Sequence, residues 1–378
     1  MHPVGIRGVG LSCALGLNAV DCVTRLFAGA VVPDRLRLDH VAEPVELSYY
    51  RIPDDAPPFD PRRFERLVPA VVREALSGAG LDEDERRRLP VYLGSSCFSI
   101  GYSESHYAAA LAAQAPDAFP MPCCGYGDLA ELARGAAGSV GPVFLYNTAC
   151  TSAANALLGA QRALASGRHE YALVVGAELA NRTTLAGFSS MQLLAQRLLP
   201  FAAERSGIVL GEGVGAVLLS AHPEAGDYLL HGGANNCDSH SVTTADPRGE
   251  SVAAVLRQAL DITGTEEVWG IRTHGTGSGA GDVAEAAGLR KTFGAMPPLS
   301  ALKPWLGHTL GACGVNELVL YRGALQRGRL PALADAGTPD PELGVQALTQ
   351  QTDAPSGRYL LNHFGFGGNN TALVLERP

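Results

Sequence analysis

The chain has 378 residues, of which 46% are hydrophobic and 18% charged, with a net charge of −9 at pH 7. This length and hydrophobic content allow a large core, in one domain or two fused ones. The negative charge argues against nucleic acid or an anionic membrane surface as the main partner. The sequence contains neither an apolar run of transmembrane length nor a recognisable signal peptide. Eight cysteines without CxxC pairs or metal-ligand spacing are typical of reduced thiols, so we expect a cytoplasmic protein without a bound metal.

The predicted elements alternate between short apolar strands and helices. A polar, proline-containing segment at residues 35–61 is predicted to be a surface excursion with little regular structure. Helices are expected at residues 63–78, 153–166 and 314–326, and strands at 91–93, 144–146, 172–175 and 215–219. This alternation predicts an α/β fold with largely parallel or mixed sheets covered by helices.

One cysteine lies where a strand gives way to a helix. The apolar run 142–146 is followed by a turn that contains Cys150, and alanine-rich helical spacing begins at Ala153. Unpaired N–H groups at a helix N-terminus favour negative charge, so we expect the Cys150 thiol to be partly ionised near neutral pH. Cys150 is therefore a candidate nucleophile, with a small buried core cysteine as the alternative.

Two histidines occupy comparable positions later in the chain. His274 follows the apolar run 268–271 and His308 follows the run 299–302, and each has a glycine beside it. Glycines let a substrate approach the backbone, and side chains at strand ends can converge on one pocket. A lone histidine is more often structural. One cysteine and two histidines at strand ends together favour a catalytic site.

Four segments resemble, in order and spacing, the signatures of the β-ketoacyl-acyl-carrier-protein synthases. These are the condensing enzymes of fatty acid and polyketide synthesis. The segments are Thr148-Ala-Cys-Thr-Ser152, His274-Gly-Thr-Gly-Ser278, Lys303 with Gly307-His308, and Asn362-His-Phe-Gly-Phe-Gly-Gly368. Together with shorter matching blocks they span nearly the whole chain.

The resemblance implies a duplicated thiolase-like fold with five layers, αβαβα. Its halves would be residues 1–222, which carry the nucleophilic cysteine, and residues 223–378, which carry the two histidines. Cys313 would then be a core cysteine on the central helix of the second half. A weak sequence echo, Ala149-Cys150 and Ala312-Cys313, is explained nearly as well by chance.

The resemblance also implies an acyltransferase that catalyses decarboxylative Claisen condensation. Cys150 would take an acyl group from a thioester, and malonyl-acyl carrier protein would lose CO2 to give a carbanion. His274 and His308, both neutral, would each donate one hydrogen bond to the enolate oxygen. The backbone N–H groups of Cys150 and Phe366 would form a second oxyanion hole. In the family, two further residues hold the histidines, and they match Lys303 and Glu285.

Other positions correspond to substrate contacts in the family. Thr276 and Ser278 match hydroxyl residues that contact the phosphopantetheine arm, which arrives on the substrate, so no resident cofactor is expected. Phe366 matches a gating phenylalanine, although plain turn packing explains an aromatic residue between glycines as well. The acyl pocket would be lined by Phe188, Phe98 and Ile100.

The implied partner is an acidic acyl carrier protein, which an acidic synthase would receive on a local basic patch. Arg62, Arg63 and Arg66 at the start of a helix are the candidates, and a plain solvated helix face is the alternative. The family further implies a dimer, formed either by two copies or with a second ketosynthase-like subunit.

A second function class remains open, a partner subunit similar to a chain-length factor that shapes the pocket of a separate ketosynthase. Ile208 stands where many relatives have a phenylalanine facing the malonyl carboxylate, and two loops are shorter than usual. Cys150 and both histidines favour catalysis, and the Lys303 motif argues against a thiolase. The acyl chain and the pathway, fatty acid, polyketide or aryl polyene, are left open.

Overall fold

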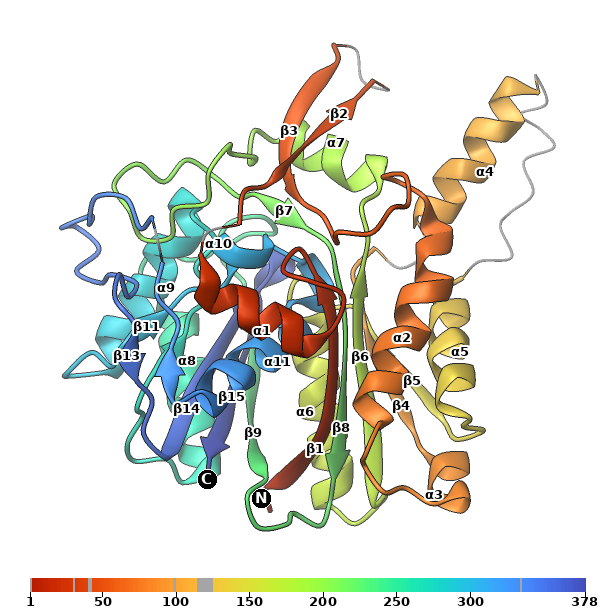
Figure 1. Ribbon diagram of the computed structural model, residues 1–378. Coiled ribbons are helices and arrows are strands. Elements are labelled where there is room, and N and C mark those ends of the chain that lie inside the picture. Colours follow the sequence, from red (N-terminus) through yellow and green to blue (C-terminus); the bar gives the residue numbers. More distant parts are fainter. Residues whose placement is uncertain (1, 30, 40–42, 98–99, 114–124, 334) are drawn as a thin grey trace.

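Two sets of five strands with the same internal order form the centre of the protein (Figure 1). The computed structural model describes residues 2–378 except 30, 40–42, 98–99, 114–124 and 334. The N-terminal half contributes β1 (Val4–Cys13), β4 (Val91–Gly94), β5 (Val143–Tyr146), β6 (Tyr171–Glu178) and β8 (Gly213–Ser220). The C-terminal half contributes β9 (Tyr228–Cys237), β10 (Ile271–Arg272), β11 (Leu299–Ser300), β14 (Gly357–Phe364) and β15 (Asn369–Arg377).

The two halves repeat one topology. Counted along the chain, the strands of each half lie side by side in the order third, second, fourth, fifth, first. In both halves the second strand is parallel to the third and fourth, and the fifth is antiparallel to its neighbours. This repeat confirms the predicted duplicated thiolase-like α/β fold. The predicted division at residues 222 and 223 lies in the connection between β8 and β9.

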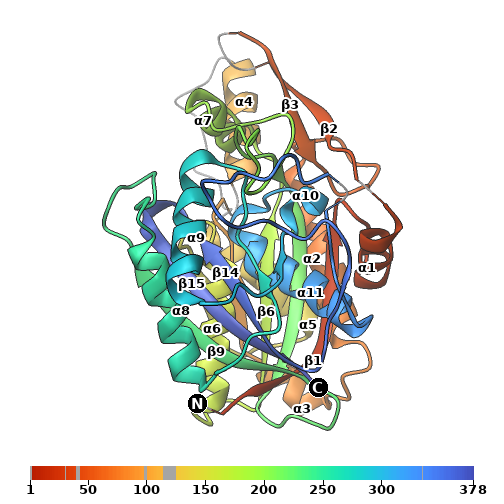
Figure 2. The same ribbon diagram turned by 90° about the vertical axis from the view of Figure 1, so that its left-hand side faces the viewer.

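Helices fill three layers around these sheets (Figures 1 and 2). The central helices α6 (Ser152–Ala165) and α11 (Cys313–Gln326) pack on each other, and each also contacts strands of both halves. α2 (Phe64–Leu76) and α5 (Tyr126–Ala137) cover the outer face of the N-terminal sheet. α8 (Glu250–Thr263) packs on the outer face of the C-terminal sheet and against α9 (Gly279–Thr292). β1 and β9 pair only at Val4, Gly5 and Ile6 of β1. The two sheets therefore join at one end and separate around the central helices.

The sequence explains why α6 and α11 occupy the centre. Both helices are buried nearly all round, as expected of a helix without a polar face. A Cβ on Gly314 would lie 2.1 Å from the backbone nitrogen of Ala154, so only glycine allows the two helices to approach this closely. The predicted helices at 63–78, 153–166 and 314–326 are confirmed, with ends within two residues.

The segment 35–61 is more regular than predicted. β2 (Asp34–Leu38) pairs with β3 (Val45–Tyr50), which pairs in turn with β7 (Leu210–Gly211) in a separate three-stranded sheet. The prediction of little regular structure is therefore wrong for the part that forms β2 and β3, whereas residues 51–60 contain no helix or strand, as predicted. On β2 the buried Leu36 and Leu38 alternate with exposed charged residues, a period-two pattern that the surrounding prolines and charges hid, whereas residues 47–50 of β3 are all buried.

The remaining elements are short or peripheral. They are α1 (Ala19–Ala28), α3 (Glu83–Arg88), α4 (Ile100–Ala112), α7 (Arg182–Ser190), α10 (Lys303–Leu306), β12 (Arg329–Leu330) and β13 (Thr352–Asp353). α4 projects from the body of the molecule (Figure 1). Among the helices that the structure describes, none is long and apolar enough to cross a membrane.

Candidate active site

The turn between β5 and α6 presents Cys150. Ala149, directly before it, has a left-handed backbone with φ 52°, a conformation that costs on the order of 1 kcal/mol for a residue other than glycine. Hydroxyl groups hold this turn. Ser152 Oγ accepts the Thr148 N–H at 3.0 Å and donates to the Ala149 carbonyl at 2.6 Å. As a result Cys150 is buried at the N-terminal end of α6, with 7% of its surface exposed.

The electrostatic surroundings of Cys150 differ from the prediction. Burial raises the pKa of the Cys150 thiol to about 11, against the lowering effects of the Lys303 charge and the Phe366 N–H. The predicted partial ionisation near neutral pH is therefore wrong, because desolvation of the thiolate outweighs the groups that favour it. The resting group is a thiol, and its proton has to leave when the sulfur attacks.

His274 follows β10, and the carboxylate of Glu285 on α9 holds its backbone. Glu285 accepts the N–H groups of His274 and Gly275, both at 2.8 Å, and the side-chain amide of Asn362 at 3.1 Å. Burial raises the pKa of this carboxyl, and these donors favour its charged form. Glu285 therefore acts on the shape of the histidine loop. On the same helix, Asp282 accepts the N–H of Thr276 at 3.1 Å.

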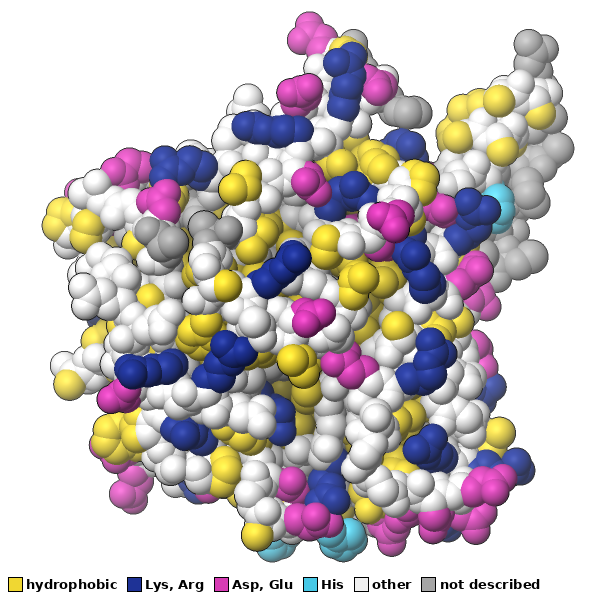
Figure 3. All heavy atoms as spheres, viewed as in Figure 1, with side chains coloured by type: hydrophobic (Ala, Val, Ile, Leu, Met, Phe, Trp, Pro, Cys, Tyr) yellow, Lys and Arg dark blue, Asp and Glu magenta, His cyan; other side chains and the backbone are white. Residues whose placement is uncertain are grey.

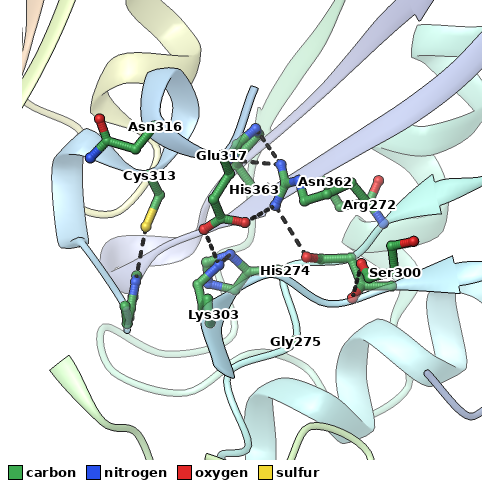
Figure 4. Close-up of polar contacts among 12 residues, drawn as sticks. Arg272, His274, Gly275, Ser300, Lys303, Cys313, Asn316, Glu317, Asn362 and His363 are labelled. Carbon is green, nitrogen blue, oxygen red and sulfur yellow. Dashed lines mark hydrogen bonds and ion pairs between the residues drawn. The ribbon is translucent and has the colours of Figure 1, made fainter. Parts of the chain in front are cut away.

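A buried network of charged side chains lies behind His274 (Figure 4). Lys303 Nζ pairs with Glu317 Oε1 at 2.7 Å and lies 3.3 Å from His274 Nδ1. The second oxygen of Glu317 pairs with Arg272 at 3.0 Å, and Arg272 also contacts His363 Nδ1 at 3.1 Å. Charged groups that are buried away from water are stable only when they pair with one another. The members of this cluster therefore hold each other in place.

Each of the two histidines has a polar partner at Nδ1. Lys303 faces Nδ1 of His274, and the Cys313 sulfur lies 3.1 Å from Nδ1 of His308. Burial, followed by the Lys303 charge, holds the pKa of both rings well below the usual range, so both are neutral. A neutral ring that accepts at Nδ1 carries its proton at Nε2. The ring centroids are 5.4 Å apart and the ring planes nearly perpendicular.

One pocket brings most of the predicted site residues together. Its lining includes Cys150, His274 and His308, together with Thr276, Ser278, Phe188, Phe366 and Ile208. The loop 238–245 forms a further wall that the sequence did not predict. Lys303 and Glu285 lie behind the histidines, with the contacts given above. The arrangement offers a sulfur nucleophile and two neutral hydrogen-bond donors to one substrate.

Two aromatic rings face each other in this pocket. Phe188 on α7 stacks on Phe366 with centroids 5.6 Å apart. Gly367 and Gly368 after Phe366 both have φ 74°, and a Cβ on Gly368 would lie 1.9 Å from the Asp238 carbonyl. The Phe366 turn therefore requires glycine at residue 368. Its role as a gate remains a prediction.

The other predicted pocket residues are less directly placed. Ile100 packs against the apolar cluster that contains Cys150 and Ile208, and it is outside the described lining of the pocket. Phe98 lies outside the described residues, and so its predicted role is not addressed by the structure.

The three arginines predicted to receive a carrier protein have different environments. Arg63 is buried and pairs with Glu212 at 2.6 Å and Asp54 at 3.0 Å, so its predicted role at the docking surface is wrong. Its neighbours Arg62 and Arg66 are 74% and 58% exposed. Figure 3 shows basic side chains interspersed with acidic ones over this part of the molecule. The missed signal was turn geometry, because Asp60 caps a short 3₁₀ turn (Pro61–Arg63) that points Arg63 inward.

Sequence reasoning also missed several residues around the histidines. These are Arg272, Asp282, Glu317 and His363, and the contact of Cys313 with His308. Glu317 did carry a signal, because it is an acidic residue in a helix stretch with Val315, Leu318 and Val319 around it. A buried charge in such surroundings requires a partner.

The repeated five-strand topology and the cysteine with two histidines together define a thiolase-fold condensing enzyme site. The chain belongs to the β-ketoacyl synthase family. Residues 3–225 match the model of the beta-ketoacyl synthase N-terminal domain, and residues 229–336 match that of the C-terminal domain.

Individual relatives agree with this assignment. The chain is 31% identical over 364 residues to the spectinabilin polyketide synthase system protein NorA' of Streptomyces orinoci, covering 86% of this chain and only 10% of that protein. It is 27% identical to 3-oxoacyl-[acyl-carrier-protein] synthase 2 of Staphylococcus aureus, covering 100% of this chain and 96% of the other. A chain in the solved complex of the ketosynthase ApeO with its chain length factor ApeC from Xenorhabdus doucetiae matches with TM-score 0.85 at 27% identity, covering 100% of this chain and 98% of that chain.

Proposed function

We propose that the chain is a β-ketoacyl synthase that condenses an acyl group on Cys150 with malonyl-acyl carrier protein in the cytoplasm. The observation that carries the proposal is the pocket in which the Cys150 thiol meets two neutral histidines, His274 and His308, whose Nδ1 atoms are already occupied. Such a pair suits a reaction that develops negative charge on oxygen and needs no strong base.

In the first half of the reaction the acyl group moves to the protein. The sulfur of Cys150 attacks the thioester carbonyl, the bond to the carrier's sulfur breaks, and the thiol proton ends on the departing phosphopantetheine thiol. The N–H groups of Cys150 and Phe366 bind the oxygen that becomes negative. The raised pKa of Cys150 makes this proton transfer part of the step.

In the second half a malonyl thioester enters, and its carboxylate leaves as CO2. The electron pair of the broken bond becomes an enolate, whose oxygen accepts hydrogen bonds from Nε2 of His274 and of His308. The enolate carbon then attacks the acyl carbonyl, the bond to Cys150 Sγ breaks, and the departing thiolate takes up a proton from solvent to restore the resting thiol. Because the histidines are neutral donors, the site stabilises the enolate without protonating its carbon.

The pocket walls suit a substrate that arrives on an arm. Thr276 and Ser278 line the pocket with hydroxyl groups 2.8 Å apart, and we assign them to the phosphopantetheine amides. Phe188 and Phe366 would border the acyl chain, with Phe366 as the gate between the two half-reactions. Arg62 and Arg66 are the exposed charges that we assign to the carrier protein.

We further propose that the protein acts as a dimer. β5 is the last strand of its sheet, and its Leu145 is 42% exposed. Hydrophobic side chains gather on α4, where Tyr107 is 51% and Leu111 49% exposed (Figure 3). A sheet edge and an exposed apolar helix are features that a partner subunit covers.

The second candidate is a partner subunit similar to a chain-length factor. It is favoured by the likeness to a complex of a ketosynthase with its chain length factor, and by Ile208 in the pocket wall. On this reading the chain would shape the pocket of a separate ketosynthase and contribute little chemistry of its own.

The two candidates separate in one experiment. The purified protein is incubated with acyl-loaded carrier protein and then with malonyl carrier protein, and the intact masses of both proteins are recorded. We expect an acyl adduct on the wild type, none on Cys150→Ala, and a product two carbons longer. Cys22→Ala, which removes another buried cysteine, is the matched control and should keep the adduct.

Histidine variants test the assignment of the second half-reaction. His274→Ala and His308→Ala should each still form the acyl adduct, and each should condense about 10²–10³-fold more slowly than the wild type. An adduct that persists in Cys150→Ala would refute the nucleophile. A wild-type protein that forms neither adduct nor product would favour the partner subunit.

A further inference from the structure

A short run of hydrogen-bonding groups ends on the ring of His308. Cys313, the first residue of α11, is fully buried with its sulfur 3.1 Å from His308 Nδ1. Thr309 Oγ1 lies 3.5 Å from the same sulfur and accepts the side-chain amide of Asn316 at 3.2 Å. Figure 4 shows Cys313 and Asn316 on α11, with a dashed line that marks the contact of the Cys313 sulfur.

The chemistry of the groups gives this run a direction. An amide nitrogen only donates, so Thr309 Oγ1 accepts from Asn316 and has its own hydrogen free for the sulfur. Burial strongly raises the pKa of Cys313, so the sulfur keeps its proton and can donate it. A ring bare at Nδ1 accepts that S–H, whereas a ring protonated at Nδ1 would leave the S–H without this acceptor and would offer the sulfur a second donor beside Thr309.

We propose that Cys313 is a positioning residue that holds His308 as the tautomer protonated at Nε2. The proposal rests on the proposed function, in which Nε2 of His308 donates to the enolate oxygen. Cys313 acts through the ring and stays away from the substrate, since it is outside the described lining of the pocket.

The tautomers of the two histidines would then be fixed by different hydrogen-bond donors. His274 receives its donor from Lys303, which brings a charge close to the enolate, whereas His308 receives a neutral thiol. The expectation that Cys313 is a core cysteine on the central helix is correct. It did not include the contact of Cys313 with His308. A second charged donor beside Lys303 would have to be buried without a partner, which a thiol avoids.

The direct test is the tautomer itself, read by ¹⁵N NMR of the purified protein labelled at histidine. We expect the wild-type His308 signals of a protonated Nε2 and a bare Nδ1, assigned by their loss in His308→Gln. In Cys313→Ala the form protonated at Nδ1 should become populated, and in Cys313→Ser the hydroxyl should restore the wild-type pattern. A wild-type ring protonated at Nδ1, or an unchanged tautomer in Cys313→Ala, would overturn the proposal.

Kinetics give the second readout. Cys313→Ala should lower kcat for condensation about tenfold, less than the 10²–10³ for removing an oxyanion donor, with KM and Cys150 acylation unchanged. Cys313→Ser should recover most of the rate. Cys22→Ala, equally buried beside Cys13, is the matched control and should leave tautomer and rate unchanged. Because the NMR result needs no turnover, an inactive protein with the expected tautomers would refute the proposed function alone.

Discussion

The two halves of the molecule share a scaffold and differ in their chemistry. Each half places a residue with a left-handed backbone three positions before its central helix, Ala149 with φ 52° before α6 and Leu310 with φ 44° before α11. By this correspondence Cys150 is equivalent to Gly311, so the sequence echo between Cys150 and Cys313 joins positions that do not correspond. The repeat determines where the turns are, and a few side chains determine what they do.

The polar groups around the two turns show this difference. Hydroxyl groups of Thr148, Thr151 and Ser152 hold the Cys150 turn through local bonds. The histidine side depends instead on the buried ions Lys303 and Glu317. Changes on the histidine side should therefore cost stability as well as activity, whereas loss of the Cys150 thiol should cost activity alone.

The largest effect is expected from Glu317→Gln, which leaves Lys303 and Arg272 without their anion. Breaking a buried ion pair in this way costs about 3–5 kcal/mol, so the denaturant midpoint should fall strongly. Glu267→Gln, at an exposed glutamate, is the matched control and should change stability by less than about 0.5 kcal/mol. Equal stability of Glu317→Gln and the control would remove the contrast between the halves.

A second prediction concerns the Cys150 turn and pH. With the pKa of the thiol at about 11, the thiolate fraction rises about tenfold per pH unit throughout the range below it. Alkylation of Cys150 by iodoacetamide, followed by peptide mass spectrometry, should therefore accelerate from pH 7 to pH 10 without levelling off. Cys150→Ala gives the background from other cysteines. A plateau near pH 7 would instead restore the thiolate that the sequence predicted.

The duplicated fold could be predicted because the order of four motifs resembles a known family, and the three candidate catalytic side chains because local signals surround them. Strand, turn and helix patterns surround Cys150, and glycines accompany His274 and His308. The environment of each of these groups could not be predicted from the sequence. The pKa of Cys150 depends on how many atoms bury it, and the burial of Arg63 depends on Glu212, 149 residues away. Contacts across such distances in the chain leave no periodic pattern to find.

The smallest effect is expected at the docking surface, which tests whether the N-terminal half also supplies the charges that meet the carrier protein. Arg62→Glu should change stability by less than about 1 kcal/mol, because the Arg62 side chain is exposed and its charge is screened. Arg66→Glu should cost more, because its partner Asp54 is buried. Acyl transfer from the carrier protein should slow severalfold at low salt. The difference should vanish toward 1 M salt, where charges act over only about 3 Å.

Arg86→Glu on α3 is the matched control, because it reverses an exposed arginine of the same half on another helix. If Arg86→Glu slowed transfer and the other two variants did not, the carrier protein would approach over α3. If all three variants slowed transfer equally, the total charge of the protein would govern the encounter, since a specific patch makes the effect depend on position. Only a slowing confined to Arg62→Glu and Arg66→Glu assigns the carrier protein to the start of α2 in the N-terminal half.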